Sequence, residues 1–211
     1  KGAGAVATNT ALGYQALNGN SSGVGLFVAG YQAGLVTTGS YSTFTGYQAG
    51  KANTSGENTA YGANVLLQNT TGTANTALGG TTTSISGALA SNTTGGSNVG
   101  VGVGALSANT TASTNTAVGY QAGYTNTTGA GNVFLGNQTG YSNTASNNTF
   151  LGNSAGYAVT SGAKNTIIGQ YNGNQGGLDI RTASNYIVLS DGDGNPKCYF
   201  GNTNYGEFTL N

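Results

Sequence analysis

Residues 115–119 read Asn-Thr-Ala-Val-Gly, and residues 148–152 read Asn-Thr-Phe-Leu-Gly. The same phrase, Asn-Thr-apolar-apolar-Gly, returns along almost the whole chain of 211 residues at steps of 16 or 17 residues, with one longer step of 23. The phrase closes on Gly13, Gly30, Gly46, Gly62, Gly79, Gly102, Gly119, Gly136, Gly152 and Gly169. One short structural unit is therefore stacked on itself about ten times.

The first residue of the phrase is as regular as the last. Asn stands four positions before the Gly in most copies, at Asn9, Asn58, Asn75, Asn98, Asn115, Asn132, Asn148 and Asn165. The second and third copies lack this Asn. An eleventh copy, residues 185–189, keeps the Asn and the apolar residues but loses the Gly.

A period this short selects the architecture. Repeats of 33 to 47 residues hold helix pairs or propeller blades, whereas 16 or 17 residues have room for two strands of about five residues and two turns. Helix is disfavoured independently, because the chain contains 39 Gly and is crowded with Thr and Asn. We predict an all-β chain that forms a parallel β-solenoid of about eleven coils. With strands roughly 4.7–4.9 Å apart, the rod would be on the order of 50 Å long.

The two apolar slots of the phrase must face opposite ways, because neighbouring side chains of a strand point to opposite faces. The first slot runs Ala11, Val28, Phe44, Ala60, Ala77, Gly100, Ala117, Phe134, Phe150, Ile167, and the second runs Leu12, Ala29, Thr45, Tyr61, Leu78, Val101, Val118, Leu135, Leu151, Ile168. One slot can fill the lumen of the coil, and the other then forms an apolar stripe larger than a soluble monomer usually exposes. We expect other copies of the chain to cover this stripe in a closed parallel homo-oligomer.

Composition excludes several classes of partner. Charged residues make up 5% of the chain, the formal net charge is zero, and His is absent. Five cations spread over the length cannot neutralise a phosphate backbone, so we expect no nucleic-acid binding. No apolar run approaches the roughly 20 residues that cross a bilayer, so we expect no membrane insertion, and the amino terminus lacks a signal-peptide pattern. The single Cys198 cannot form an intrachain disulfide.

The chain divides into two parts. Residues 1–177 form the solenoid repeat region, in which the 23-residue step predicts a loop insertion at about residues 80–97. Residues 178–211 are expected to form a terminal coil and a β-hairpin, centred on the Asp191-Gly192-Asp193-Gly194 turn, that caps the stack or connects it onward. The repeated Tyr-Gln-Ala that begins at Tyr14, Tyr31 and Tyr47 predicts a tyrosine ladder on consecutive coils.

Residues 115–123 and 148–156 resemble the repeats of trimeric autotransporter adhesin heads, which also occur in bacteriophage tail fibres. The resemblance covers nearly all of the chain, and it implies a left-handed β-roll packed as a parallel homotrimer. The end of the chain, residues 185–202, is similar to the segment that joins such repeats to a self-cleaving chaperone domain in phage fibres. Two departures are that the coils are longer than the adhesin repeat and that no charged neck, stalk or anchor follows.

Enzymatic sites are not expected. The acids are only Glu57, Asp179, Asp191, Asp193 and Glu207, and without His a Ser or Cys nucleophile lacks its usual base. Besides a hairpin turn, Asp191 and Asp193 have two alternative interpretations, a glycosidase carboxylate pair and the start of a calcium loop. The calcium pattern breaks because Pro196 and Asn202 stand where Gly and Glu are needed. Residues 100–104, Gly-Val-Gly-Val-Gly, lie in the repeat register and precede no helix, so they are not read as a phosphate-binding loop. We expect no catalytic, metal or cofactor site.

The resemblance implies a structural and adhesive segment of a phage tail fibre, located in the virion outside the cell. Its expected partners are two further copies of the chain, other tail proteins and a host-surface receptor such as a glycan, with no contact residues assigned. The head of a bacterial surface adhesin, or of another extracellular filament, is the alternative. A third idea, ice binding by Thr ladders, is disfavoured because most copies offer one Thr rather than Thr-x-Thr.

Overall fold

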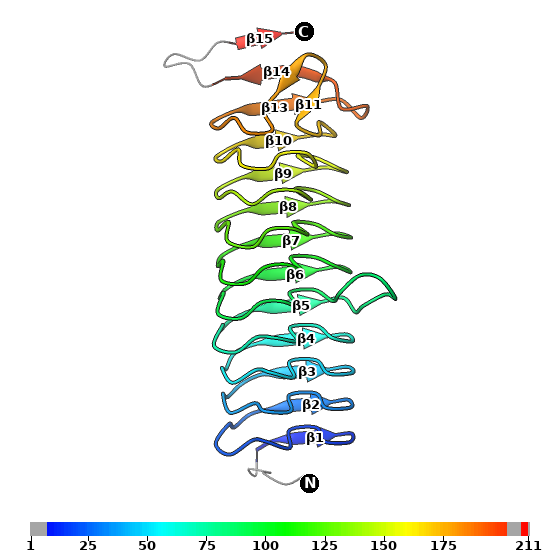
Figure 1. Ribbon diagram of the computed structural model, residues 1–211, viewed down its shortest axis with the longest axis vertical. Helices are drawn as coiled ribbons and strands as arrows, with labels where there is room; N and C mark the ends of the chain where they lie inside the picture. The colour runs from blue at the N-terminus through cyan, green and yellow to red at the C-terminus, as the bar shows by residue number, and fades with distance from the viewer. Residues whose placement is uncertain (1–7, 202–207, 211) are drawn as a thin grey trace.

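The repeated phrase folds into a rod in which each turn of the chain lies directly on the previous one (Figure 1). This computed structural model describes residues 8–201 and 208–210. Its stacked strands are β1 (Thr10–Leu12), β2 (Phe27–Ala29), β3 (Thr43–Thr45), β4 (Thr59–Tyr61), β5 (Thr76–Leu78), β6 (Val99–Val101), β7 (Thr116–Val118), β8 (Val133–Leu135), β9 (Thr149–Leu151), β10 (Thr166–Ile168) and β13 (Ile187–Ser190). The described residues contain no helix, and the predicted all-β parallel solenoid of about eleven turns is confirmed.

Strand pairing follows the sequence repeat residue for residue. Each of these strands pairs in parallel with the next, and equal positions of the phrase lie opposite each other, as Ala117 lies opposite Phe134 between β7 and β8. The 21-residue step from β10 to β13 does not disturb this register, because Ile167 lies opposite Val188. The sequence period therefore fixes the register along the whole stack.

From β1 to β10 each coil contains one strand of three residues, so the expectation of two five-residue strands per coil was wrong. The opposite side of the coil is a series of turns, in which Leu106 (φ 50°) and Gly104 (φ 75°) adopt left-handed backbone conformations. This side is still bonded from coil to coil, since the Leu106 N–H donates to the Ala122 carbonyl at 2.9 Å. Left-handed residues curl the backbone tightly, which prevents a second extended strand.

The Gly that ends each phrase is required by the closeness of neighbouring coils. Gly79 has φ of +134°, and a Cβ added to it would lie 2.6 Å from the carbonyl carbon of Gly102 in the next coil. No L-residue with a side chain fits such a contact. The position that closes the repeat in sequence is therefore the point where successive backbones touch.

The lumen is filled by matched pairs of large and small residues. Where the middle strand residue is large, as at Phe134, the facing turn position is Gly140, and a Cβ there would lie 2.5 Å from the Phe134 ring. Where the strand residue is small, as at Ala60 and Gly100, the turn carries Leu66 or Leu106. All of these side chains are buried. Most coils thus fill the lumen by one of two routes, and the coil with Ala117 and Gly123 is filled by Phe134 and Leu106 from the coils on either side.

The Asn of the phrase forms a buried ladder. Asn115 Oδ1 accepts the backbone N–H of Asn132 at 2.9 Å, while Asn115 Nδ2 donates to the Gly129 carbonyl at 2.9 Å. In the same way, the Asn of other coils accepts the backbone N–H at the start of the next phrase. The last example is Asn165, which accepts the N–H of Tyr186 at 2.8 Å. In the third coil Ser42 takes the place of Asn and accepts from the N–H of Asn58 at 3.1 Å.

A second Asn column, which the sequence pattern did not reveal, lies on the turn side of the lumen. Its members are Asn20, Asn53, Asn69, Asn92, Asn109, Asn126 and Asn143. Asn92 Nδ2 donates to Asn69 Oδ1, and Asn109 Nδ2 to Asn92 Oδ1, both at 2.7 Å. Two amide columns therefore supply the buried polar part of the lumen.

The extra residues of the long step occupy a narrower segment than expected. Gly80 lies against Ala63, Gly87 lies against Asn64, and only residues 81–86 leave the path of the coil. Residues 91–96, which we expected to belong to the loop at 80–97, follow the regular coil, because Asn92 lies in the second Asn column. This loop is the bulge beside β5 in Figure 1.

The chain changes character after β10. A small antiparallel hairpin, β11 (Asn174–Gln175) with β12 (Leu178–Asp179), interrupts the last coil, so the boundary expected at 177/178 falls in its turn. β13 then pairs antiparallel with β14 (Pro196–Phe200), and β14 with β15 (Phe208–Leu210). Residues 202–207 and 211 of the expected terminal segment lie outside the described residues.

The matched lumen pairs predict a compensating double substitution. Phe134→Ala alone leaves a cavity worth about 3–5 kcal/mol, and Gly140→Leu alone overfills the coil. The double variant copies the Ala60 and Leu66 pair, and Leu66 already tolerates φ of 51°. Its free energy of unfolding should therefore fall by much less than the sum of the two single decreases. Denaturant unfolding followed by circular dichroism measures the three free energies, and strict additivity would contradict the pairing.

The Asn ladder predicts a large loss of stability on removal of one member. Asn115→Ala leaves the buried N–H of Asn132 without its acceptor, at about 1–3 kcal/mol, whereas the Gly129 carbonyl loses one donor and keeps Asn126 Nδ2 at 2.8 Å. The neighbouring Thr116→Ala, on the outer side of the strand, is the matched control and should cost under about 1 kcal/mol. Equal effects of the two variants on the unfolding midpoint would argue against the ladder.

Candidate functional site

The outer face of the stacked strands carries an unbroken series of side chains. The first and third residues of each strand point outward, and the large apolar residues in the third position are between 41% and 59% exposed: Leu12, Tyr61, Leu78, Leu135, Leu151, Ile168 and Leu189. The middle residues, such as Val28 and Val188, are buried. The expectation that adjacent apolar slots face opposite ways is confirmed.

Threonine dominates the first position of the same face. It occurs at Thr10, Thr43, Thr59, Thr76, Thr116, Thr149 and Thr166. Thr-x-Thr occurs once among the described strands, in β3, and elsewhere this Thr stands beside an apolar third residue or Tyr61. The face combines methyl groups, hydroxyls and aliphatic side chains without charge, which suits packing against another protein surface more than a regular hydroxyl lattice.

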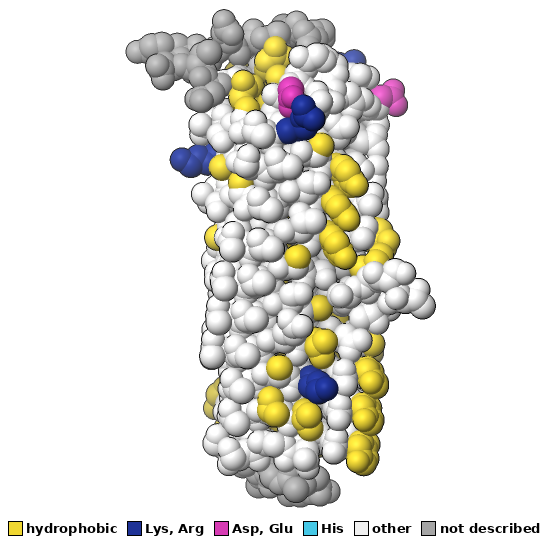
Figure 2. Space-filling view, viewed as in Figure 1, with side chains coloured by type: hydrophobic (Ala, Val, Ile, Leu, Met, Phe, Trp, Pro, Cys, Tyr) yellow, Lys and Arg dark blue, Asp and Glu magenta, His cyan; other side chains and the backbone are white. Residues whose placement is uncertain are grey.

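The predicted tyrosine ladder is present at the edge where the strands end. Tyr14 and Tyr31 stack with ring centroids 5.5 Å apart, and Tyr31 and Tyr47 stack at 5.3 Å with their planes 7° apart. Each is at least 41% exposed. Figure 2 shows hydrophobic side chains in rows parallel to the rod axis, with few charged groups between them.

The glutamines that follow these tyrosines form an amide ladder. Gln32 Nε2 donates to Gln15 Oε1, and Gln48 Nε2 donates to Gln32 Oε1, both at 2.8 Å. In each pair the upper residue donates and the lower one accepts. The tyrosine column is thus supported by an amide column of fixed direction.

A second tyrosine column was missed. Tyr124 and Tyr141 stack at 5.2 Å, and Tyr141 and Tyr157 at 5.0 Å. Burial, followed by the neighbouring Tyr157 and Tyr124, raises the pKa of Tyr141. The sequence contained the information, because these residues each stand five positions after a phrase Gly, but they lie outside the phrase itself.

The carboxylates near the C-terminal end serve local structure. Asp191 Oδ1 accepts the backbone N–H groups of Asp193 at 3.0 Å and Asn195 at 2.9 Å, and Asp191 Oδ2 lies 2.9 Å from Lys197 Nζ. Lys197 first, and then the Asn195 N–H, lower the pKa of Asp191 to about 2. The expected turn therefore joins β13 and β14, and Asp191 holds it closed.

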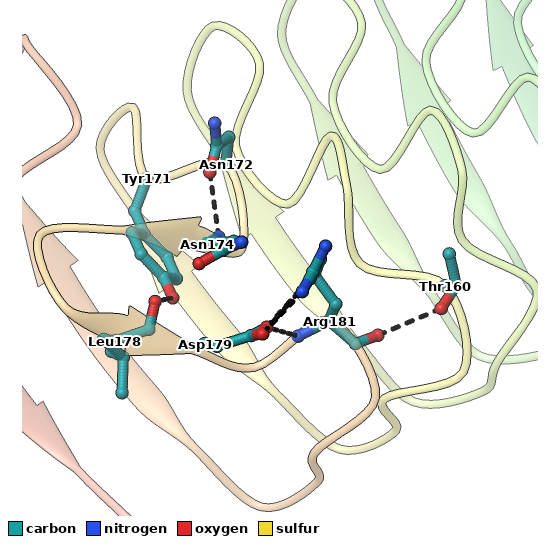
Figure 3. Close-up of polar contacts among 7 residues, drawn as sticks. All are labelled: Thr160, Tyr171, Asn172, Asn174, Leu178, Asp179 and Arg181. Atoms are coloured by element: carbon teal, nitrogen blue, oxygen red, sulfur yellow. Dashed lines mark hydrogen bonds and ion pairs between the residues drawn. The ribbon is translucent and has the colours of Figure 1, made fainter.

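The β11–β12 hairpin is tied to the stack by a buried phenol (Figure 3). The Tyr171 hydroxyl donates to the Leu178 carbonyl at 2.8 Å, and burial raises its pKa far above the ordinary value. Asp179 and Arg181 form an exposed ion pair at 2.7 Å, while the Thr160 hydroxyl donates to the Arg181 carbonyl at 3.2 Å. These contacts fix the hairpin against the preceding coil.

Other sequence candidates form no clustered site. Residues 100–104 run from β6 into a turn of the coil, in register with the other repeats. Within residues 8–201 and 208–210, no three side chains among His, Cys, Asp and Glu come together as a metal site would require. Glu207 and Asn202 lie outside the described residues, and Cys198 is a half-buried free thiol in β14.

No protein-family model, curated protein or solved structure matches this chain. Over the described part of the chain, no helix has the length and apolar character to cross a membrane. The functional argument therefore rests on the surfaces of the rod.

The Asp191 contacts predict a defined response to acid. The pKa of Asp191 is about 2 in the folded protein and about 3.9 in the unfolded chain. The contribution of ionised Asp191 to the free energy of unfolding is therefore present above about pH 4 and is lost as the pH falls through 2. NMR titration of the Asp191 carboxyl should give a midpoint near 2, and Lys197→Ala should raise it. The distant Lys51→Ala is the control, and an unchanged midpoint in Lys197→Ala would refute the assignment.

Proposed function

We propose that this chain is a structural and adhesive segment of a phage tail fibre. Three parallel copies would form a rigid rod that positions or forms a surface for a host receptor. The observation that carries the proposal is the exposed apolar third-position column, which follows the sheet from Leu12 to Leu189. An uncovered stripe of this kind favours association, because large exposed apolar patches usually mark interaction surfaces.

A second copy of the same chain is the best-matched cover for this face. The column repeats once per coil over about ten coils, so only a surface with the same repeat can contact it along its full length. A parallel copy has that repeat, and a closed ring of copies leaves no free stripe. The number three and the left-handed winding come from the resemblance to adhesin and fibre repeats.

The rod would act mechanically. Every coil is bonded to the next through the sheet and through the turn side, and most coils are also bonded through the buried Asn ladder. Bending would strain all three sets of bonds together. The antiparallel pairing of β14 with β13 supports a role for this end in covering the last parallel edge.

The proposal is non-enzymatic, and it includes other tail proteins as partners at the ends of the rod. Its support is that Asp191 and Asp179 are engaged in local contacts to Lys197 and Arg181. The alternative is the head of a bacterial surface adhesin or another extracellular filament, because these share the repeat. Genes for baseplate proteins beside the coding sequence would favour the fibre, and an outer-membrane anchor domain would favour the adhesin.

Assembly in solution tests the proposal. Light scattering on the purified protein should give three times the mass of one chain. Leu135→Glu with Leu151→Glu places charges on the apolar column and should shift the mass towards that of one chain, with the circular dichroism spectrum unchanged. The matched control is Thr128→Glu with Ser161→Glu, two exposed residues outside the strands. A wild-type chain that stays monomeric at every concentration would overturn the proposal.

A further inference from the structure

The loop at residues 81–86 borders an open surface hollow of about 310 Å³ that no repeat feature explains. It is lined by Asn64 and by the loop residues, of which Thr81, Thr82, Thr83, Ser84 and Ser86 carry hydroxyls. The volume lies at the lower end of the range of about 300–1,000 Å³ that is usual for ligand pockets. Apart from Ile85, every lining side chain is polar and uncharged.

The loop is held in shape by its own hydrogen bonds. The Thr82 N–H donates to the Ile85 carbonyl at 3.0 Å, and Thr82 Oγ1 accepts the Ile85 N–H at 3.1 Å. Ile85 lies against Gly104 of the following coil, where an added Cβ would come within 2.9 Å of its side chain. The hollow is therefore preformed, which reduces the ordering cost of binding.

An unused acceptor belongs to Asn64, which lines the hollow. Asn64 occupies the position of the glutamine ladder, in which each residue accepts from the amide of the coil above. The coil above Asn64 offers Gly87, which has no side chain and whose added Cβ would lie 2.8 Å from the backbone carbonyl oxygen of Asn64. Asn64 Oδ1 is accordingly buried with no hydrogen-bond partner among the described residues. Because this oxygen has almost no exposed surface, a neighbouring side chain must shift before a ligand hydroxyl in the hollow can supply the missing donor.

The tyrosine column leads directly to this hollow. The N–H of Asn64 donates to the Tyr47 carbonyl at 2.8 Å, so Asn64 lies one coil above Tyr47. In the next coil the small Ala63 stands at the sequence position of the tyrosines, and it lies against Gly80. Figure 2 shows a row of hydrophobic side chains along the edge beneath the protruding loop. Exposed aromatic rings beside a hydroxyl-rich pocket combine the apolar and polar contacts that sugar rings need.

We propose that this hollow and the Tyr47, Tyr31 and Tyr14 column bind an uncharged oligosaccharide. One sugar lies in the hollow, where its hydroxyls contact Asn64 and the loop hydroxyls, and the glycan chain runs along the rod axis over the tyrosines. The absence of charged side chains from the lining selects neutral sugars over sialylated or sulfated ones. This site deepens the adhesive role proposed above and rests on it for its biological purpose.

A printed array of neutral oligosaccharides with sialylated and sulfated counterparts, probed with the labelled protein, tests the site. The expected result is binding to neutral glycans, followed by a calorimetric dissociation constant for the best of them. Tyr47→Ala should weaken that constant about tenfold, the size of one aromatic contact. Deletion of residues 81–86, which shortens the 23-residue step to the 17 residues of its neighbours, should abolish binding.

Tyr141→Ala in the second tyrosine column is the matched control and should bind as tightly as the wild type. Circular dichroism and light scattering on every variant separate loss of binding from loss of fold or assembly. Absence of binding to neutral glycans, preference for anionic ones, or full binding by the deletion variant would each overturn the site. A trimer that binds no glycan would refute only this inference, whereas a monomer that binds one would refute only the fibre proposal.

Discussion

Backbone and amide hydrogen bonds that run from each coil to the next hold the rod at a single spacing, and the rest of the structure depends on that spacing. Because coils contact through the glycines that close each phrase, as Gly79 contacts Gly102, every coil must follow nearly the same path. A side chain at one position is then stacked on the same position of its neighbours. The molecule is therefore best understood as a set of columns rather than as a set of residues.

This constraint accounts for the composition of the chain. A charged residue repeated in one column would place like charges about 4.8 Å apart, at a cost near 1 kcal/mol per pair even in bulk water. Amides can donate to one neighbour and accept from the other, as Gln32 does between Gln15 and Gln48. Asn, Gln and Thr therefore fill the polar columns. The charged side chains lie mainly near the C-terminal end, where the repeat breaks down and Asp191 and Lys197 can pair locally.

The same constraint links the surface to function. A perfect stack offers long uniform columns, which suit association with another copy of the same rod. Recognition of a smaller ligand needs a place where a column is interrupted. Residues 81–86 provide such a place, because Gly87 offers no side-chain donor to Asn64 and the loop borders an open hollow beside it. The apolar face is a consequence of the repeat, and it suits another copy of the chain. The loop hollow is a departure from the repeat, and it suits a smaller ligand.

The sequence by itself determined the period, the parallel register, the opposite exposure of Ala117 and Val118, and the Tyr14 column, because each follows from which residues recur at one spacing. It did not determine the single strand per coil, since that depends on left-handed turns at residues such as Leu106 whose conformation only the stacked neighbours enforce. Nor did it reveal that Asn92 belongs to a column rather than a loop, or that Asn64 lacks a donor. Those facts depend on where the six extra residues leave the coil. The length of a step shows that residues have been inserted, but it does not show which residues of the step still contact the coils on either side.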